Sequence, residues 1–289
     1  MKEAIICPLM TDTETAQDVQ FTYDSQQRKS PALEELRNII RYRDLVFQFV
    51  RRDVVARYKR SVLGVAWTML QPLGTMIVLA IVFSQLFGQI EGYTAYLISG
   101  LVAWIFFAQA TTAAVYHSVW GGVLMRRIYI PHTAFPISSI GAAVINLILS
   151  LVPLLLIFLI TKRPITPAIL FLPESILLLS AFALGVSLIL SSMAVYFPDI
   201  SEMYQIIIQA WMYLTPIMYP ETILPEAYRF WLLHLNPMYY LINVFRYPLY
   251  SGSLPPMDIL LAGGIISVTT LVIGWIQYSR GADEFAYHI

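Results

Sequence analysis

The chain has 289 residues, of which 58% are hydrophobic and 12% are charged, and its formal net charge is zero. Soluble domains carry about 25% charged residues, so this composition excludes an ordinary soluble protein and indicates an integral membrane protein. The single cysteine, Cys7, excludes an internal disulfide and any CxxC metal site.

The first 60 residues are polar and divide into two parts. Residues 1–29 are rich in Thr, Asp, Gln and Glu and predict a mobile cytoplasmic tail. Residues 30–60 predict an amphipathic helix in the membrane interface, because apolar residues recur at helical spacing: Leu33, Leu36, Ile40, Phe47, Val50 and Val54. The alternative is a cytoplasmic helix that packs on a partner.

An abrupt loss of charge follows Arg60. No charged residue occurs from Ser61 to Ile90, a run longer than the roughly 20 apolar residues that cross a bilayer as a helix. Eleven of the 18 Lys and Arg residues lie in residues 1–60. Because basic clusters stay on the cytoplasmic side, the chain before Ser61 is expected to be cytoplasmic.

Six charge-poor segments predict six transmembrane helices within residues 61–289, at about 62–87, 93–119, 136–160, 174–196, 203–220 and 257–278. An even number of spans returns the C-terminus to the cytoplasm. Cytoplasmic segments then hold 14 Lys and Arg residues and external segments hold four, in agreement with the positive-inside rule. The sequence therefore predicts an all-α integral protein of the inner (plasma) membrane with both termini in the cytoplasm.

Two connections between these spans are unusual. The cytoplasmic one, 121–131, is short, basic and apolar, and predicts a short helix that ends at Pro131. The external one, 221–256, is rich in proline and aromatic residues. It is too hydrophobic for a solvated loop and too often broken by proline to span, so it predicts short re-entrant or interfacial helices.

The chain lacks the common motifs of an enzyme. It contains no GxxxxGK[ST], HExxH or GxSxG pattern, and its four histidines are scattered, so we expect no catalytic, cofactor-binding or metal site. The interiors of the predicted spans carry no charged residue, which argues against ion-coupled transport. These features favour a protein that passes a large substrate and takes its energy from elsewhere.

The segment Arg51–Trp67, followed by Gln71-Pro72-Leu73, resembles the start of permease subunits of type-2 ABC exporters. The most similar group exports cell-surface polysaccharides: O-antigen of lipopolysaccharide, capsule and teichoic acid. The resemblance covers about residues 35–280, and further matches occur at Ile130-Pro131, 197–200, 214–219 and 235–238. One departure is Pro198, where family members often carry Arg before the aspartate.

The resemblance implies a homodimer of six-span subunits, each bound to a separate ATP-binding cassette subunit that holds the ATP. Closure of those subunits would be relayed through the amphipathic helix and the short helix at 121–131. Candidate coupling residues are Arg126, Arg127, Tyr129, Arg51 and Arg52. The alternative role of Arg126 and Arg127 is to hold the topology by facing anionic lipid.

The implied substrate is a polysaccharide carried on a polyprenyl diphosphate lipid, passing between predicted spans one and five. Candidate path residues are Trp67, Gln71, Phe83, Phe87, Gln205, Trp211, Thr215 and Tyr219, because amides and hydroxyls bind sugar hydroxyls and rings stack on sugar faces. Phe83 and Phe87, four residues apart, share one helical face. The alternatives are interhelical hydrogen bonds and the aromatic belt of the membrane interface.

Two other functions compete with polysaccharide export. One is a type-2 ABC permease for a drug or a lipid. The other is a polyprenyl-phosphate glycosyltransferase, which needs acidic residues near a membrane face. Asp199 and Glu202 are the only candidates for that role, and the pair could equally be the acidic start of a helix.

Overall fold

The computed structural model describes residues 31–59, 66–87, 92–120, 131–160 and 166–288. These residues form helices and the short connections between them, and none of them is in a β-strand. The all-α prediction is therefore confirmed for the described part of the chain.

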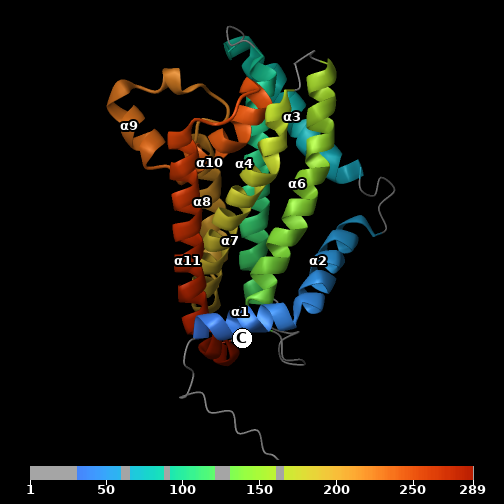
Figure 1. The fold of residues 1–289 in the computed structure, drawn as a ribbon, viewed down its shortest axis with the longest axis vertical. Helices are drawn as coiled ribbons and strands as arrows, with labels where there is room; N and C mark the ends of the chain where they lie inside the picture. The colour runs from blue at the N-terminus through green and yellow to red at the C-terminus, as the bar shows by residue number, and fades with distance from the viewer. Residues whose placement is uncertain (1–30, 60–65, 88–91, 121–130, 161–165, 289) are drawn as a thin grey trace, which may run out of the picture. The chain divides into compact units, whose positions relative to one another are not determined.

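Four helices are long and apolar enough to cross a membrane (Figure 1). They are α4 (Tyr93–Trp120), α6 (Ala134–Ile160), α7 (Leu172–Tyr196) and α11 (Met257–His288). They match the predicted spans 93–119, 136–160, 174–196 and 257–278. A short 3₁₀ helix, η2 (Pro167–Phe171), leads into α7.

Helix α4 is the centre of the bundle, in contact with α3, α6, α7, α8 and α10. Of the 18 consecutive residues that make up the most apolar part of α4, 72% are buried, compared with 17% in the corresponding part of α11. Its side chains Leu97, Ala103 and Phe107 are fully buried in the main hydrophobic core. The other helices are therefore positioned by how they pack on α4.

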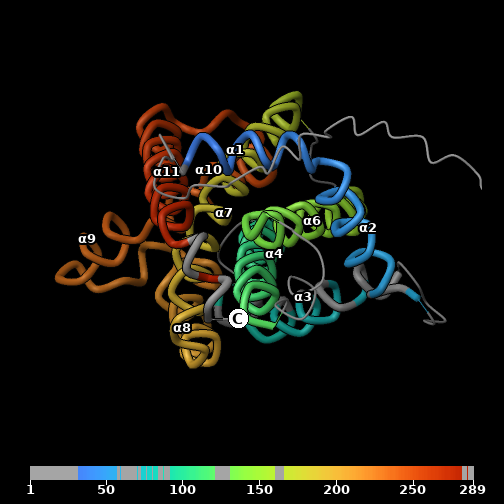
Figure 2. Tube along the Cα trace, turned by 90° about the horizontal axis from the view of Figure 1, so that it is seen from below, coloured from blue at the N-terminus to red at the C-terminus, as the bar shows by residue number. Residues whose placement is uncertain are grey.

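Helices α3 (Ala66–Phe87) and α8 (Ile200–Leu214) flank α4 on one side of the bundle (Figure 2). They occupy the predicted spans 62–87 and 203–220. The second helix, α8, stops at Leu214, whereas the predicted span continues to residue 220. Pro216 has no amide hydrogen to donate to the preceding turn, which favours the end of the helix at this point.

The N-terminal segment predicted as one helix over 30–60 forms two, α1 (Pro31–Arg41) and α2 (Arg43–Tyr58). They meet at Tyr42, whose ψ of 22° departs from the helical value. Helix α1 lies across the lower ends of the long helices, next to the C-terminal end of α11 (Figure 1). The single straight helix expected from the apolar spacing is therefore replaced by two shorter ones with a bend.

The connection at 221–256 contains short helices, as predicted. These are the 3₁₀ turn η3 (Glu221–Ile223), α9 (Glu226–His234), α10 (Pro237–Arg246) and the π-helical turn η4 (Tyr247–Ser251). Helix α10 is packed into the core, where Met238, Val244 and Phe245 are fully buried. The aromatic side chains of α9 are exposed instead.

Helices α7 and α11 approach most closely where two glycines face each other. A methyl group at Gly185 would lie 2.6 Å from the Leu271 amide nitrogen, and one at Gly274 would collide with the Gly185 carbonyl oxygen. Such small-residue contacts let helix backbones pack closely in a membrane. The crossing of these two helices therefore depends on the absence of side chains at both positions.

We expect Gly185→Ala and Gly274→Ala each to lower the free energy of unfolding by about 1–3 kcal/mol, because the added methyl groups overpack this crossing. Thermal or detergent-induced unfolding in lipid nanodiscs measures the change. The matched control is Gly264→Ala, which lies on α11 like Gly274 and where a methyl group meets no atom within 4 Å. Equal stability of all three variants would contradict the proposed close crossing.

Candidate functional site

A non-helical turn, Thr215–Tyr219, follows the end of α8 and leaves backbone carbonyl groups without helical partners. Side chains of α4 supply donors to it. The Tyr93 hydroxyl donates to the Met218 carbonyl oxygen. The Tyr96 hydroxyl donates to the Pro216 carbonyl oxygen at 3.2 Å. Two tyrosines one turn apart on α4 therefore hold the outgoing chain against the centre of the bundle.

Arg246, at the end of α10, supplies a third donor to this turn. It is 4% exposed, its Nη2 lies 3.2 Å from the Pro216 carbonyl oxygen, and its guanidinium carbon lies 3.8 Å from the centroid of the Tyr96 ring. A methyl group on Gly100 would collide with the guanidinium. Burying a cation is costly, and here the carbonyl oxygen and the ring face offset part of that cost.

Asn236 joins the end of α8 to α10. Its Oδ1 accepts from Trp211 Nε1 at 2.9 Å, and its Nδ2 donates to Thr215 Oγ1 at 2.9 Å. The same asparagine caps α10 by accepting from the Met238 amide. Trp211 and Thr215, both predicted path residues, thus point into the subunit and connect its parts. The Trp211 ring also packs edge-on against Phe107 at 5.5 Å.

The remaining predicted path residues lie in different surroundings. The Phe83 and Phe87 rings stack at 6.1 Å with an interplanar angle of 7°, and both are half-buried against the core. The Tyr219 hydroxyl donates to the Tyr213 carbonyl oxygen at 2.9 Å, and Gln205 is exposed on α8. Trp67 and Gln71 belong to α3, but their side chains lie outside the described part of the structure.

The faces of α3 and α8 that turn away from α4 are largely unburied. On α3 these are mainly aliphatic: Ile77, Val78, Ile81 and Val82. On α8 they mix aliphatic and polar groups: Met203, Gln205, Ile206, Ile207, Gln209 and Tyr213. The structure therefore brings the exposed surfaces of the two predicted path helices to the same side of the bundle.

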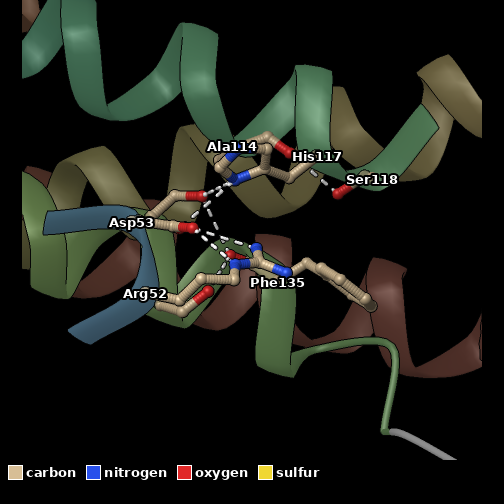
Figure 3. A network of polar contacts seen from close by, with 8 residues as sticks. Arg52, Asp53, Ala114, His117, Ser118 and Phe135 are labelled. Carbon is tan, nitrogen blue, oxygen red and sulfur yellow. Dashed lines mark hydrogen bonds and ion pairs between the residues drawn. The ribbon is translucent and has the colours of Figure 1, made fainter. Parts of the chain in front are cut away.

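Near the opposite end of α4, α2 contacts α4 through a carboxylate (Figure 3). Asp53 Oδ1 accepts from Arg52 Nε at 3.0 Å and from Nη2 at 2.9 Å, and Asp53 Oδ2 lies 3.7 Å from His117 Nδ1. That nitrogen is also 3.0 Å from Ser139 Oγ of α6. The predicted coupling residues Arg51 and Arg52 are both exposed, and Arg52 is bound to the neighbouring carboxylate of Asp53.

Asp53 and His117 were not among the predicted functional residues. A carboxylate within an otherwise basic stretch, at the end of an amphipathic segment, was the available signal for Asp53. No spacing rule links it to His117, because the two lie on helices that are far apart in the sequence. Their contact follows only from the packing of α2 and α4 on the same helix, α6.

A second junction joins α1 to the start of α6 and to α11. The buried Glu35 carboxylate accepts from Thr133 Oγ1 at 2.9 Å, and Trp275 Nε1 donates to the Ala32 carbonyl oxygen at 3.1 Å. The Tyr278 hydroxyl donates to the His132 carbonyl oxygen at 3.1 Å. These contacts fix the residues that directly follow 121–130.

The predicted coupling residues Arg126, Arg127 and Tyr129 lie outside the described residues. Among the described residues, no group of three or more His, Cys, Asp or Glu side chains could hold a metal ion. The described arrangement provides helix contacts and polar surfaces, and it offers no cluster of catalytic groups around Asp199 and Glu202, which are both on the surface at the start of α8.

Comparison with known proteins shows similarity to one family of transporters and to two of its permease proteins. The family model described as ABC-2 type transporter matches residues 44–250. The O-antigen export system permease protein RfbA of Myxococcus xanthus is 30% identical over 266 residues, covering 88% of this chain and 98% of the relative. A protein of the same name from Klebsiella pneumoniae is 27% identical over 249 residues, covering 84% of this chain and 94% of the relative.

We expect Arg246→Met to lower the free energy of unfolding by about 1.5–3 kcal/mol, because it removes a charged donor from a buried carbonyl oxygen. Thermal unfolding in nanodiscs measures the loss, and hydrogen exchange at 215–219 shows whether the turn loosens. Arg229→Met is the matched control, since Arg229 also donates to a backbone oxygen, that of Glu221, but at a partly exposed position. A loss no larger than the control's would contradict the role of Arg246.

Proposed function

Because this chain belongs to the ABC-2 type transporter family, we propose that it is the membrane subunit of an ATP-driven exporter of cell-surface polysaccharide. One observation carries the proposal: the similarity to the Myxococcus xanthus O-antigen permease extends over 98% of that relative. A match of this extent involves the whole transmembrane unit, including the path taken by the substrate. An O-antigen-type polysaccharide is therefore favoured over a drug or a lipid.

The proposed topology has six crossings of the inner membrane. The four long helices supply four of them, α3 with 22 residues is long enough for a fifth, and α8 extended by the turn Thr215–Tyr219 supplies the sixth. The α1 end of the described chain and the C-terminal end of α11 lie at the same end of the bundle (Figure 1), which supports an even number of crossings. The basic cluster in residues 1–60 favours the cytoplasm for that end.

Helix α1 is proposed to lie in the cytoplasmic membrane interface. Its apolar side chains Leu33, Leu36 and Ile40 are 47–66% exposed, while Glu35 is buried against Thr133. An exposed apolar face on a helix that is anchored by a buried carboxylate is expected where lipid covers that face. At the other end of the bundle, α10 is the proposed re-entrant helix and α9 the interfacial one.

The proposed channel forms between two copies of the subunit. The unburied faces of α3 and α8 lie on the same side of α4, and pairing two such faces around an axis would enclose a path. Gln205 and Gln209 on α8 are exposed and are suited to bind sugar hydroxyls. Phe83, Phe87 and Tyr219 are proposed to border the external end of this path.

Energy is proposed to come from a separate ATP-binding cassette subunit, which holds the ATP, so that this chain needs no cofactor. The proposed contacts are the segment 121–131, with Arg126, Arg127 and Tyr129, and α2, with Arg51 and Arg52. The junction between Glu35 and Thr133 supports this role, because it connects the end of 121–131 to α1. The proposed substrate is a polysaccharide on a polyprenyl diphosphate lipid.

Deletion of the gene is expected to remove the polysaccharide from the cell surface, and the cloned chain is expected to restore it, as measured by immunoblotting of surface polysaccharide. The purified chain in nanodiscs should hydrolyse ATP only when its ATP-binding cassette partner is added. Unchanged surface polysaccharide in the deletion strain, together with impaired export of a drug or lipid, would favour the competing permease function.

Cysteine labelling tests the topology in a Cys7→Ser background, which leaves no other thiol in the chain. We expect Glu226→Cys on α9 to react with a membrane-impermeant maleimide in cells whose outer layer has been permeabilised, because α9 is proposed to be external. Asp283→Cys near the C-terminus should react only after the inner membrane is opened. The reverse pattern would refute the proposed orientation.

A further inference from the structure

A hollow of about 230 Å³ lies between α2, α4 and α6. Four alanines form part of its wall, and their small side chains leave this space where three helices meet. The rest of the wall is polar: Asp53, Gln109, His117, Ser139 and Asn146. A polar hollow is expected to hold water or a polar ligand, because its groups need hydrogen-bond partners.

Asp53 is the group in this hollow that most needs a ligand. Its Oδ1 accepts from Arg52, whereas its Oδ2 is buried and has no hydrogen-bond partner. The nearest donor to Oδ2 is His117 Nδ1 at 3.7 Å, a nitrogen that already lies 3.0 Å from Ser139 Oγ. A buried carboxylate oxygen of this kind destabilises the protein unless a donor reaches it.

The chemistry of the wall selects one class of ligand. The carboxylate of Asp53 repels a phosphate or another anion, and the polar groups disfavour an acyl chain. Carboxylate, imidazole, hydroxyl and amide groups together provide both donors and acceptors. Adjacent hydroxyl groups on a sugar ring, each a donor and an acceptor, match this mixed set. The space of about 230 Å³ corresponds to about eight water molecules at roughly 30 Å³ each, which one ring would displace.

The position of the hollow fits the proposed transport path. Gln109 lines it and also lines a second hollow of about 340 Å³ between α3, α4 and α8. This second hollow extends to Met218 in the turn after α8. The two hollows therefore follow one another along α4, with Gln109 between them, and the polar one lies at the α2 end.

We propose that the hollow between α2, α4 and α6 is a sugar-binding subsite for the exported chain, in which the Asp53 carboxylate accepts a hydrogen bond from a ring hydroxyl. Gln109, His117, Ser139 and Asn146 surround the same ring. The inference rests on the proposed function, because the sugar is that of the exported polysaccharide. Occupancy places the substrate directly against α2, a helix proposed to respond to the ATP-binding partner.

The test uses the full permease with its ATP-binding cassette partner in nanodiscs. The probe is the host cell's own surface polysaccharide, freed from its lipid by mild acid, and binding is measured by saturation-transfer difference NMR. We expect Asp53→Asn to weaken binding about tenfold or more, because a charged acceptor is lost. Asp44→Asn is the matched control, since Asp44 lies on the same helix with its side chain 91% exposed, and it should bind as the unchanged protein does.

A second pair of variants tests the space itself. Ala113→Leu is expected to fill the hollow and to abolish binding, whereas Gly264→Leu adds the same side chain in the apolar groove between α7 and α11 and should leave binding intact. If Ala113→Leu fails to assemble, the binding measurement on Asp53→Asn still tests the subsite, because asparagine has nearly the same size as aspartate.

Equal binding by the unchanged protein, Asp53→Asn and any assembled Ala113→Leu would overturn the subsite. Absence of binding by the unchanged protein would overturn it as well. Either result leaves the proposed function standing if the cloned chain restores surface polysaccharide in the deletion strain. Failure of that restoration is the separate result that removes the proposed function.

Discussion

The structure depends on satisfying the carbonyl groups of the turn Thr215–Tyr219, which follows the end of α8. In a membrane no water is at hand to bind such groups, so irregular backbone is tolerated only where protein supplies the donors. Tyr93 and Tyr96 of α4 and Arg246 of α10 do so. Because these donors come from two other helices, the break in α8 determines where α4 and α10 must converge. The buried position of α10 is thus linked to the unpaired carbonyl groups after α8, which Arg246 of α10 must reach.

Hydropathy and spacing in the sequence predicted the features that depend on neighbouring residues of the same helix. The four long helices follow from uninterrupted apolar runs, and the stacking of Phe83 on Phe87 follows from their spacing of four residues. The turn that begins at Thr215 was not predicted, because Ile217 and Met218 continue the apolar pattern beyond Pro216. The bend at Tyr42 was also missed, since the apolar stripe continues on both sides of it.

The candidate site was less accessible to sequence reasoning, because its contacts join distant segments. Trp211 and Thr215 were chosen as path residues for their ring and hydroxyl groups, yet both are bound to Asn236, which lies beyond α9. Asp53 and His117 meet only through the packing of three helices. In a span, a polar side chain looks the same in the sequence whether it binds a neighbouring helix or a substrate, and only its partners distinguish the two.

The junction between Trp275 and Ala32 has a consequence for how the protein is made. Helix α1 leaves the ribosome before α11, and one of its carbonyl groups accepts a hydrogen bond from Trp275 on α11. Helix α1 therefore gains this contact only after α11 has been synthesised. A truncated or misinserted C-terminus leaves α1 without this contact.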